Sequence, residues 1–433
     1  MKKYVTWLFA LLWLTSLFYL HHISRSRFNL LWSVYSIAFI AYLFLVLKST
    51  LTLKQGIVLA IILRLSLFFS PPLLSDDYYR FIWDGAVAHA GINPSTYTPR
   101  EISTHQEWLQ APEGFFEKLN SPDYYTVYPP MAQGFFHLSF LINGWNIEGH
   151  IVWIRTIVMV ADFFILWLLW LLLKQKHLSE KKILLYGLNP LIILEFSGNV
   201  HFDGLMILGL LVALYFAMNK NYAASGLSIA ISVLFKMLTL PLIPFLGKEL
   251  EWRRRILFGT LILLIIIIGF TWSFGTDLHW TQSIALWFNH FEFNASMYYL
   301  LRAIGFAVKG YNSIVIIGPC LIILIAMSYF WILYRYYQGK ILTPDKAMLF
   351  FLTIYFLLST TVHPWYISSL LVLGILTGYS FPIVWTYLVF LSYSHYEGGL
   401  SNEQYPIIAT EYILLSVFMI WEIKRTTIQY SLK

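Results

Sequence analysis

Long apolar runs constrain the fold of this chain more than any other feature of its sequence. A helix needs about 20 mainly apolar residues to cross the hydrocarbon core of a bilayer. Runs close to that length recur along the 433 residues, so we predict an all-α polytopic membrane protein with about 12–13 transmembrane helices. The runs are 4–20, 28–47, 55–70, 150–173, 183–198, 202–219, 256–274, 312–334, 346–362, 365–379, 382–396 and 405–422.

The composition excludes a soluble enzyme. Apolar and aromatic residues make up 58% of the chain and charged residues only 12%, whereas soluble proteins carry about 25% charged residues. The single cysteine, Cys320, excludes a disulfide framework or a thiolate metal cluster. Basic cytoplasmic loops account for the net charge of +7, because no basic aromatic patch typical of nucleic-acid binding lies outside the apolar runs.

The distribution of lysine and arginine predicts the orientation of the chain. Basic residues gather in the segments 174–182 and 248–255, which we place in the cytoplasm. The segment 70–130 carries eight acidic and three basic residues, so we place it outside. Residues 70–149 are therefore predicted to form a large extracytoplasmic loop with interfacial helices, within a single membrane domain of residues 1–433.

Two segments do not fit simple crossings. Residues 131–143 are apolar but short, and counting them as a span would place the basic segment 174–182 outside. We predict that they form an interfacial or re-entrant helix within the outer loop. Residues 222–247 are interrupted by Lys236 and two prolines. This pattern predicts two half-length helices whose broken backbone lines a cavity, because lipid does not tolerate unpaired backbone groups.

Two adjacent carboxylates, Asp76 and Asp77, follow the third apolar run. Such a pair could share a proton and supply a general base, or it could coordinate Mg²⁺ or Mn²⁺. The structural alternative is a helix cap beside one solvated acid. Ionisable groups at the membrane boundary are functional candidates by default, so both residues are candidates for the catalytic base.

The residues after this pair are predicted to form a short amphipathic helix in the membrane interface. Arg80 could orient a carboxylate or bind a phosphate bidentately, or it could contact lipid headgroups. Trp83 and Tyr128 are candidates for substrate contacts because aromatic faces suit sugar rings, and Asn93 belongs to a turn that stiffens the loop. Interfacial aromatic belts use the same residue types, so the aromatic assignments stay open.

A second group of polar residues lies after the fifth apolar run and at the interrupted segment. His201 and Asp203 could ligate a metal together with the Asp pair, although a hydrogen-bonded pair that caps the next helix is the simpler interpretation. Lys236 lies among apolar residues and needs an anionic partner. That partner could be a substrate phosphate or Asp203.

His363 lies at the boundary between two further apolar runs and is followed by Trp365 and Tyr366. Its imidazole could donate to the same phosphate or contact a sugar, and the two aromatic rings are candidates for substrate contacts. Together with Lys236 and Arg80, His363 completes the predicted phosphate-binding group.

These segments, taken in order, resemble the membrane glycosyltransferases of the GT-C superfamily. In particular, they resemble the polyprenol-phosphomannose-dependent α-mannosyltransferases of bacteria over about residues 55–370. The first matching segment is Ser-Asp-Asp-Tyr-Tyr-Arg-Phe-Ile-Trp-Asp-Gly at 75–85, together with 91–94 and 97–99. The second is the Tyr-Pro-Pro turn in 126–133, and the third runs from Leu-Asn-Pro-Leu at 188–191 to His201 and Asp203. The last two are Phe235-Lys236 and His363-Pro364-Trp365-Tyr366.

The resemblance implies a GT-C-type bundle with juxtamembrane helices in the first outer loop. It implies that a sugar, most simply mannose, is transferred from a polyprenyl phosphate to a glycan or glycolipid acceptor with inversion of the anomeric configuration. The resemblance assigns the role of catalytic base to Asp76 or Asp77 and favours Asp76. It also implies that Lys236 and Arg80 bind the donor phosphate. Many relatives work without a metal, so no cofactor is expected, although a divalent cation is compatible. The location implied is the bacterial inner membrane, with the site facing outside.

A protein of another class remains an alternative. A lipid or solute transporter could use Asp76, Asp203 and Lys236 as an intramembrane charge relay. A transporter of the usual kind would show repeated halves and no large outer loop, so the long aromatic, proline-rich loop favours an enzyme. Within the enzyme class, a lipid-linked sugar other than mannose stays open.

Overall fold

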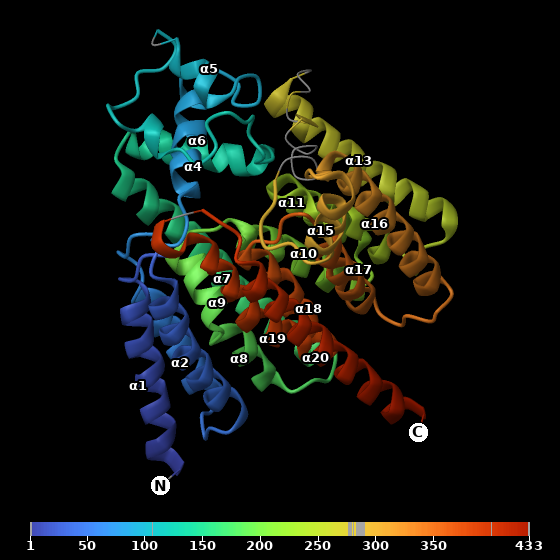
Figure 1. Cartoon of the computed structure of the whole chain (residues 1–433). Coiled ribbons are helices and arrows are strands. Elements are labelled where there is room, and N and C mark those ends of the chain that lie inside the picture. The colour runs from blue at the N-terminus through green and yellow to red at the C-terminus, as the bar shows by residue number, and fades with distance from the viewer. Residues whose placement is uncertain are drawn as a thin grey trace. The chain divides into compact units, whose positions relative to one another are not determined.

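The computed structural model (Figure 1) describes residues 2–105, 107–275, 279, 281–282, 291–399 and 401–431. The described residues are mainly helical, and their extended backbone pairs at one isolated parallel bridge between Phe293 and Thr361. The all-α class is therefore confirmed. The chain divides into two compact units, of which unit 1 comprises 1–67, 169–195 and 288–433, and unit 2 comprises 68–168 and 196–287.

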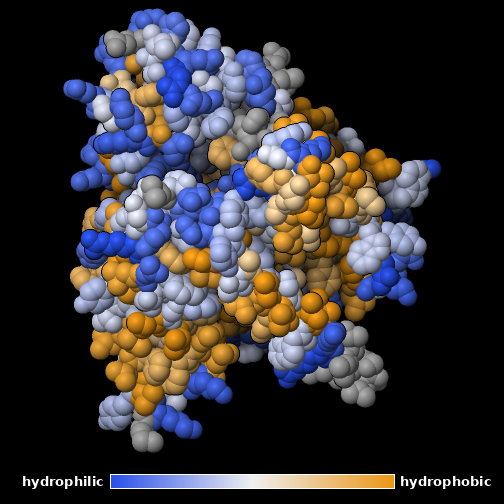
Figure 2. All heavy atoms as spheres, in the orientation of Figure 1, coloured by the Kyte–Doolittle hydropathy of each residue, from blue (hydrophilic) through white to orange (hydrophobic). Residues whose placement is uncertain are grey.

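Six helices in the described part of the chain are long and apolar enough to cross a membrane. Many of their large apolar side chains face outward, and Figure 2 shows broad hydrophobic areas on the molecular surface. Apolar side chains so exposed need lipid around them, which confirms a polytopic membrane protein. The six helices are α1 (Lys2–Leu20), α2 (Phe28–Leu47), α7 (Ile147–Gln175), α13 (Trp252–Phe274), α16 (Ile314–Tyr337) and α20 (Tyr405–Ser431).

Among the described residues, helices of spanning length are fewer than the 12–13 predicted spans, because several apolar runs fold as shorter pieces. A seventh span is available where Pro190–Gly198 and Asp203–Met218 meet at an angle of 116°. Prolines begin several of these pieces, and a proline disfavours helix at the residue before it. The shorter helices are α3 (Leu53–Leu65), α8 (Ile183–Gly187), α9 (Pro190–Ile192), α17 (Pro344–Leu358), α18 (Ile367–Thr377) and α19 (Phe381–Leu388).

Unit 2 contains the predicted loop helices. Helix α4 (Asp77–His89) packs against α6 (Pro130–Asn143), which confirms a short separate helix at 131–143. The two backbones approach closely at Gly85, where an added Cβ would lie 2.4 Å from the carbonyl oxygen of Phe136. The rings of Phe81 and Phe136 stack 4.6 Å apart beside this contact. Only glycine allows this approach, so the α4–α6 pair forms a fixed platform.

The interrupted segment in unit 2 breaks where the sequence predicts. Helix α11 (Tyr222–Phe235) packs against α10 (Asp203–Met218) and ends at Lys236, whose backbone is extended with φ −159° and ψ 126°. A 3₁₀ helix, Met237–Leu242, and the short α12 (Ile243–Leu246) follow. The prediction of two half-length helices meeting near Lys236 is therefore confirmed.

Unit 1 is held together by polar contacts between its helices. Arg64 on α3 is fully buried and donates to the carbonyl oxygen of Gly187 at 2.6 Å. Lys176 and Asp345 form an ion pair at 2.6 Å. Because water is absent from a membrane interior, these buried polar groups need protein partners, and their pairing fixes which helices adjoin.

Candidate active site

The Asp pair lies at the start of α4 in unit 2. Asp76 is the residue before the helix and Asp77 is its first residue, and both side chains are partly exposed. The N-terminus of a helix carries a partial positive charge that favours carboxylates in this position. The partial exposure leaves room for a substrate group to reach them.

Two side chains from distant segments and that of the nearby Ser75 surround Asp77. Asn120 donates from Nδ2 to Asp77 Oδ1 at 2.8 Å, and His201 Nε2 lies 3.9 Å from Asp77 Oδ2. The same imidazole nitrogen lies 3.2 Å from the hydroxyl oxygen of Ser75, which accepts from the backbone N–H of Asp77 at 3.3 Å. His201 was predicted from sequence, whereas Asn120 and Ser75 were not. The structure thus brings the first motif and the His201 motif together.

The turn that presents His201 has an unusual backbone. Val200 is buried and has a φ of +57°, a conformation that a β-branched residue rarely adopts. The side chain of Asn199 accepts from the backbone N–H of Leu74 at 3.3 Å and so ties this turn to the segment before the Asp pair. Arg155 on α7 donates to the carbonyl oxygens of residues 197 and 198. Strained backbone that its surroundings hold in place is typical of functional sites.

A second charged pair lies in the same unit. Lys236 Nζ lies 2.7 Å from Asp203 Oδ1, with the lysine side chain 28% exposed and the aspartate 6% exposed. Asp203 is the first residue of α10. Of the two partners considered from sequence for Lys236, Asp203 is the one it contacts in the structure.

Arg80 lies inside the α4–α6 platform and holds the loop around residues 121–126. Its guanidinium pairs with Asp84 at 2.7 Å and is nearly buried. It also donates to the carbonyl oxygens of Ser121 at 2.9 Å and Tyr124 at 3.0 Å. Of the contacts that the sequence suggested for Arg80, namely a carboxylate, a phosphate or a lipid headgroup, the structure shows a carboxylate, that of Asp84.

The loop held by Arg80 has one exposed side. Arg100 and Asp123 form an ion pair there, and both side chains are more than half exposed. The hydrogen bond from Arg100 holds the pKa of Asp123 below its usual range. This exposed pair offers a control for the interior contacts of the loop.

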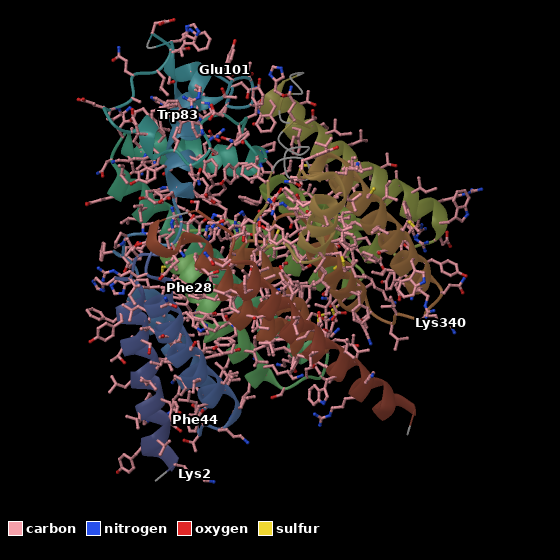
Figure 3. All side chains as sticks on the ribbon, in the orientation of Figure 1. Lys2, Phe28, Phe44, Trp83, Glu101 and Lys340 are labelled. Carbon is pink, nitrogen blue, oxygen red and sulfur yellow. The ribbon has the colours of Figure 1, made fainter. Side chains whose placement is uncertain are left out.

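The other loop residues predicted from sequence have mainly packing roles in the structure. Trp83 is buried within the helical group of α4 and α6 (Figure 3), with its ring 6.4 Å from that of Phe115. Asn93 accepts from the backbone N–H of Ser95 at 3.0 Å, as expected for a turn. Tyr128 packs edge to face against two phenylalanine rings.

His363 belongs to an aromatic cluster in unit 1. Its imidazole stacks on Trp365 at 4.5 Å and on Phe293 at 4.7 Å, and Tyr366 meets it edge-on at 5.3 Å. Phe293 is placed by backbone hydrogen bonds with Thr360 and Val362. The predicted residues thus divide between the two units, and Phe293 is a member of the His363 cluster that the sequence did not reveal.

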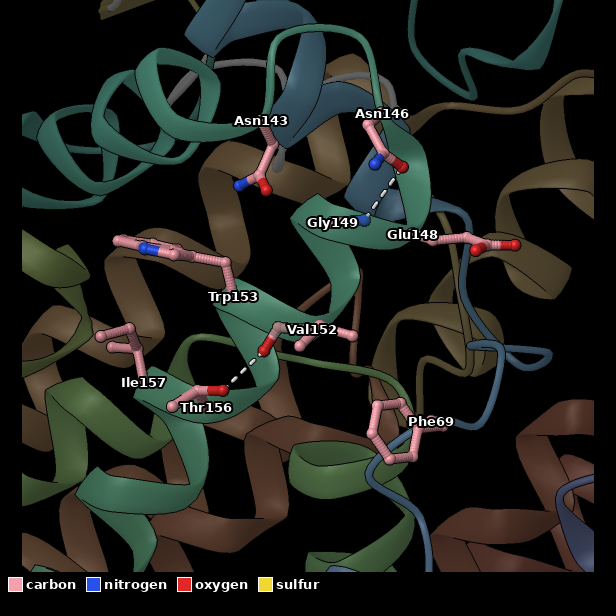
Figure 4. A pocket seen from close by; sticks show the side chains of 9 residues that line it. All are labelled: Phe69, Asn143, Asn146, Glu148, Gly149, Val152, Trp153, Thr156 and Ile157. Carbon is pink, nitrogen blue, oxygen red and sulfur yellow. Dashed lines mark hydrogen bonds between the residues drawn. The ribbon is translucent and has the colours of Figure 1, made fainter.

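A groove of about 530 Å³ crosses the first three turns of α7 in unit 2 (Figure 4). Figure 4 shows the Trp153 ring on one side of the helix and the Glu148 carboxylate on the other, with Gly149 between them. Phe69 and Asn146 also line it. No lysine, arginine or histidine lies among the described lining residues. An aromatic face with amide and carboxylate groups suits a neutral polyol better than a phosphate.

The fold and the site together describe a polytopic membrane protein in which a carboxylate pair adjoins a histidine and a lysine–aspartate pair lies in the same unit. Residues 8–250 match the family model described as "Alpha-(1->6)-mannopyranosyltransferase, N-terminal domain". The chain belongs to this family and is a glycosyltransferase, as the motifs suggested. It is also similar to alpha-(1->6)-mannopyranosyltransferase A of Corynebacterium glutamicum, with 20% identity over 345 residues that cover 70% of this chain and 67% of the relative.

Proposed function

We propose that this protein transfers a mannosyl group from a polyprenyl phosphate donor to a glycan or glycolipid acceptor. The reaction would take place at the outer face of a bacterial inner membrane. The observation that carries the proposal is the meeting of Asp77, Asn120 and His201 beside the start of α4, in a chain of the mannopyranosyltransferase family.

The proposed chemistry is a single displacement. Asp76 or Asp77 takes the proton of the acceptor hydroxyl, whose oxygen attacks the anomeric carbon of the donor. The bond from that carbon to the phosphate oxygen breaks, and the polyprenyl phosphate leaves as a stable anion. A positioned base contributes about 10²–10⁴-fold to such a reaction. One displacement inverts the anomeric centre, so a β-linked donor yields an α-mannoside.

Lys236 is proposed to supply the cation for the departing phosphate. Its side chain is 28% exposed and lies at the break between α11 and the 3₁₀ helix. A compact ammonium suits phosphate, and a phosphate would compete with Asp203 for it. We propose that this reaction needs no metal and that Arg80 supports the loop. His363, Trp365 and Tyr366 are proposed as further substrate contacts.

The groove at the start of α7 is proposed to receive a sugar of the acceptor. The Trp153 ring lies 6.0 Å from Phe135, and Phe135 lies 5.5 Å from Phe235, the neighbour of Lys236. Ring contacts therefore connect Trp153 in the groove to the residue before Lys236. The uncharged amides and the single carboxylate argue for a neutral sugar rather than for the donor phosphate.

The experiment that tests the proposal uses the purified full chain with radiolabelled polyprenyl phosphomannose and a panel of oligosaccharide and glycolipid acceptors. Label in an acceptor, with loss of β-configuration at the donor carbon, supports mannosyl transfer. A protein that moves labelled lipid or solute across proteoliposomes without forming product is a transporter, and that result would overturn the proposal. If only a different lipid-linked sugar is transferred, that sugar takes the place of mannose in the proposal.

A further inference from the structure

We propose that Asn120 is a positioning residue for the Asp77 carboxylate. This inference rests on the proposed function, in which Asp77 is one of two candidates for the base. Asn120 comes from the loop before α6, 43 residues beyond Asp77, and its Nδ2 lies 2.8 Å from Asp77 Oδ1. Nothing in its own sequence surroundings singles it out.

The hydrogen bond gives the two oxygens of Asp77 different surroundings. Oδ1 accepts from Asn120, whereas Oδ2 faces His201 Nε2 at 3.9 Å. An ionised carboxylate only accepts, so the amide must present its nitrogen, and the orientation of Asn120 is decided by chemistry. Charge-assisted bonds of this kind are about twice as strong as neutral ones. The hydrogen bond therefore favours one rotation of the carboxylate, with Oδ2 toward His201.

Asn120 can act in this way because the protein fixes its loop. Its own Oδ1 accepts from the hydroxyl of Ser121 at 3.0 Å. The buried Arg80 holds the next carbonyl oxygens of the loop, at Ser121 and Tyr124. Arg80 and Asp77 lie on the same helix one turn apart. The contacts thus close a ring from α4 through Arg80 and the loop back to α4, with Asn120 as the member that touches the candidate base.

Asn120 itself is exposed. The effect of replacing it on catalysis can therefore be measured apart from any effect on packing. An exposed amide contributes little to the core, so its replacement should leave folding intact. Arg80 does not offer this separation, because removal of the guanidinium leaves the buried Asp84 carboxylate without its cationic partner and destabilises the platform.

The experiment compares Asn120→Leu and Asn120→Asp with the natural chain in the mannosyl-transfer assay. For Asn120→Leu we expect kcat to fall about tenfold to a hundredfold, the worth of one hydrogen bond to a charged group, with donor KM nearly unchanged. For Asn120→Asp we expect a larger loss near neutral pH, because two carboxylates then face each other, and partial recovery on acidification when they share a proton. The leucine variant should not recover.

The matched control is Asp123→Asn, which removes the exposed contact with Arg100 from the same loop and should leave transfer unchanged. If Asn120→Leu has the same kcat as the natural chain, the inference is overturned. It is also overturned if Asn120→Leu and Asn120→Asp show the same dependence of kcat on pH. If the natural chain transfers no sugar, the proposed function fails instead. Full activity in Asp77→Asn, with transfer still present in the natural chain, would leave Asn120 without a base to position.

Discussion

The ammonium nitrogen of Lys236 lies 2.7 Å from the carboxylate oxygen Oδ1 of Asp203, at the point where α11 ends. The pair links the first residue of α10 to the break in the following hairpin. An ion pair of this kind is either purely structural or a place where a substrate anion exchanges with the aspartate. The two possibilities predict different kinetics.

Lys236→Met should raise the donor KM about tenfold or more, because a hydrogen bond to a charged phosphate is lost. Asp203→Asn should not raise it, since the lysine is then more available to the phosphate. Steady-state kinetics with varied donor concentration measure the donor KM of each variant and so distinguish the two possibilities. Lys176→Met is the matched control, because it breaks an ion pair of similar length with Asp345 in unit 1 and should leave donor KM unchanged. Equal increases in KM for Lys236→Met and Asp203→Asn would show that the pair is structural.

Val200→Gly should be at least as stable as Val200→Ala, the reverse of the order at an ordinary buried position. Both variants lose buried side-chain atoms, and glycine loses one methyl group more, about 0.8 kcal/mol. Only glycine relieves the left-handed backbone, which costs roughly 1–2 kcal/mol in other residues. Thermal unfolding of the two variants measures the difference. A clearly more stable alanine variant would contradict strain at this turn.

Trp153→Ala should raise the acceptor KM, because the aromatic face of the groove is removed, and should leave the donor KM unchanged. Trp272→Ala serves as the control, since Trp272 is 91% exposed on α13 and does not line the groove. Kinetics with varied acceptor and fixed donor give the comparison. A rise in donor KM instead would indicate that the groove receives the lipid-linked donor.

Chelation of divalent cations should leave transfer intact, because Lys236 is proposed to supply the positive charge at the phosphate. The measurement is the rate of transfer with and without EDTA, with added Mg²⁺ and Mn²⁺ as controls. The Asp pair keeps its proposed role as base only if the rate persists. Loss on chelation and recovery with one cation would assign these carboxylates to a metal.

The sequence predicted those features that depend on local pattern. The break at Lys236 follows from a charge and two prolines in an apolar run, and the short helix at 131–143 follows from length. Contacts between segments that are distant in the chain could not be predicted from the sequence. Asn120 meets Asp77 across 43 residues, and no periodicity marks an exposed amide in a loop.

The interior position of Arg80 was also hidden from sequence. Its spacing from the Asp pair suits an outward phosphate contact equally well, and only the carbonyl oxygens of a distant loop decide the direction. The bend of 116° between Pro190–Gly198 and Asp203–Met218 reduces the number of full spans for a similar reason. The break between the two helices contains Val200 with its positive φ, which composition does not reveal.

The most direct test of the account is the rate of mannosyl transfer by Asp76→Asn, Asp77→Asn and the double variant, each expressed to the natural level. Loss of the base should reduce the rate about 10²–10⁴-fold in one single variant and in the double, with donor KM little changed. Full activity in both single variants and in the double variant would contradict a carboxylate base at the start of α4.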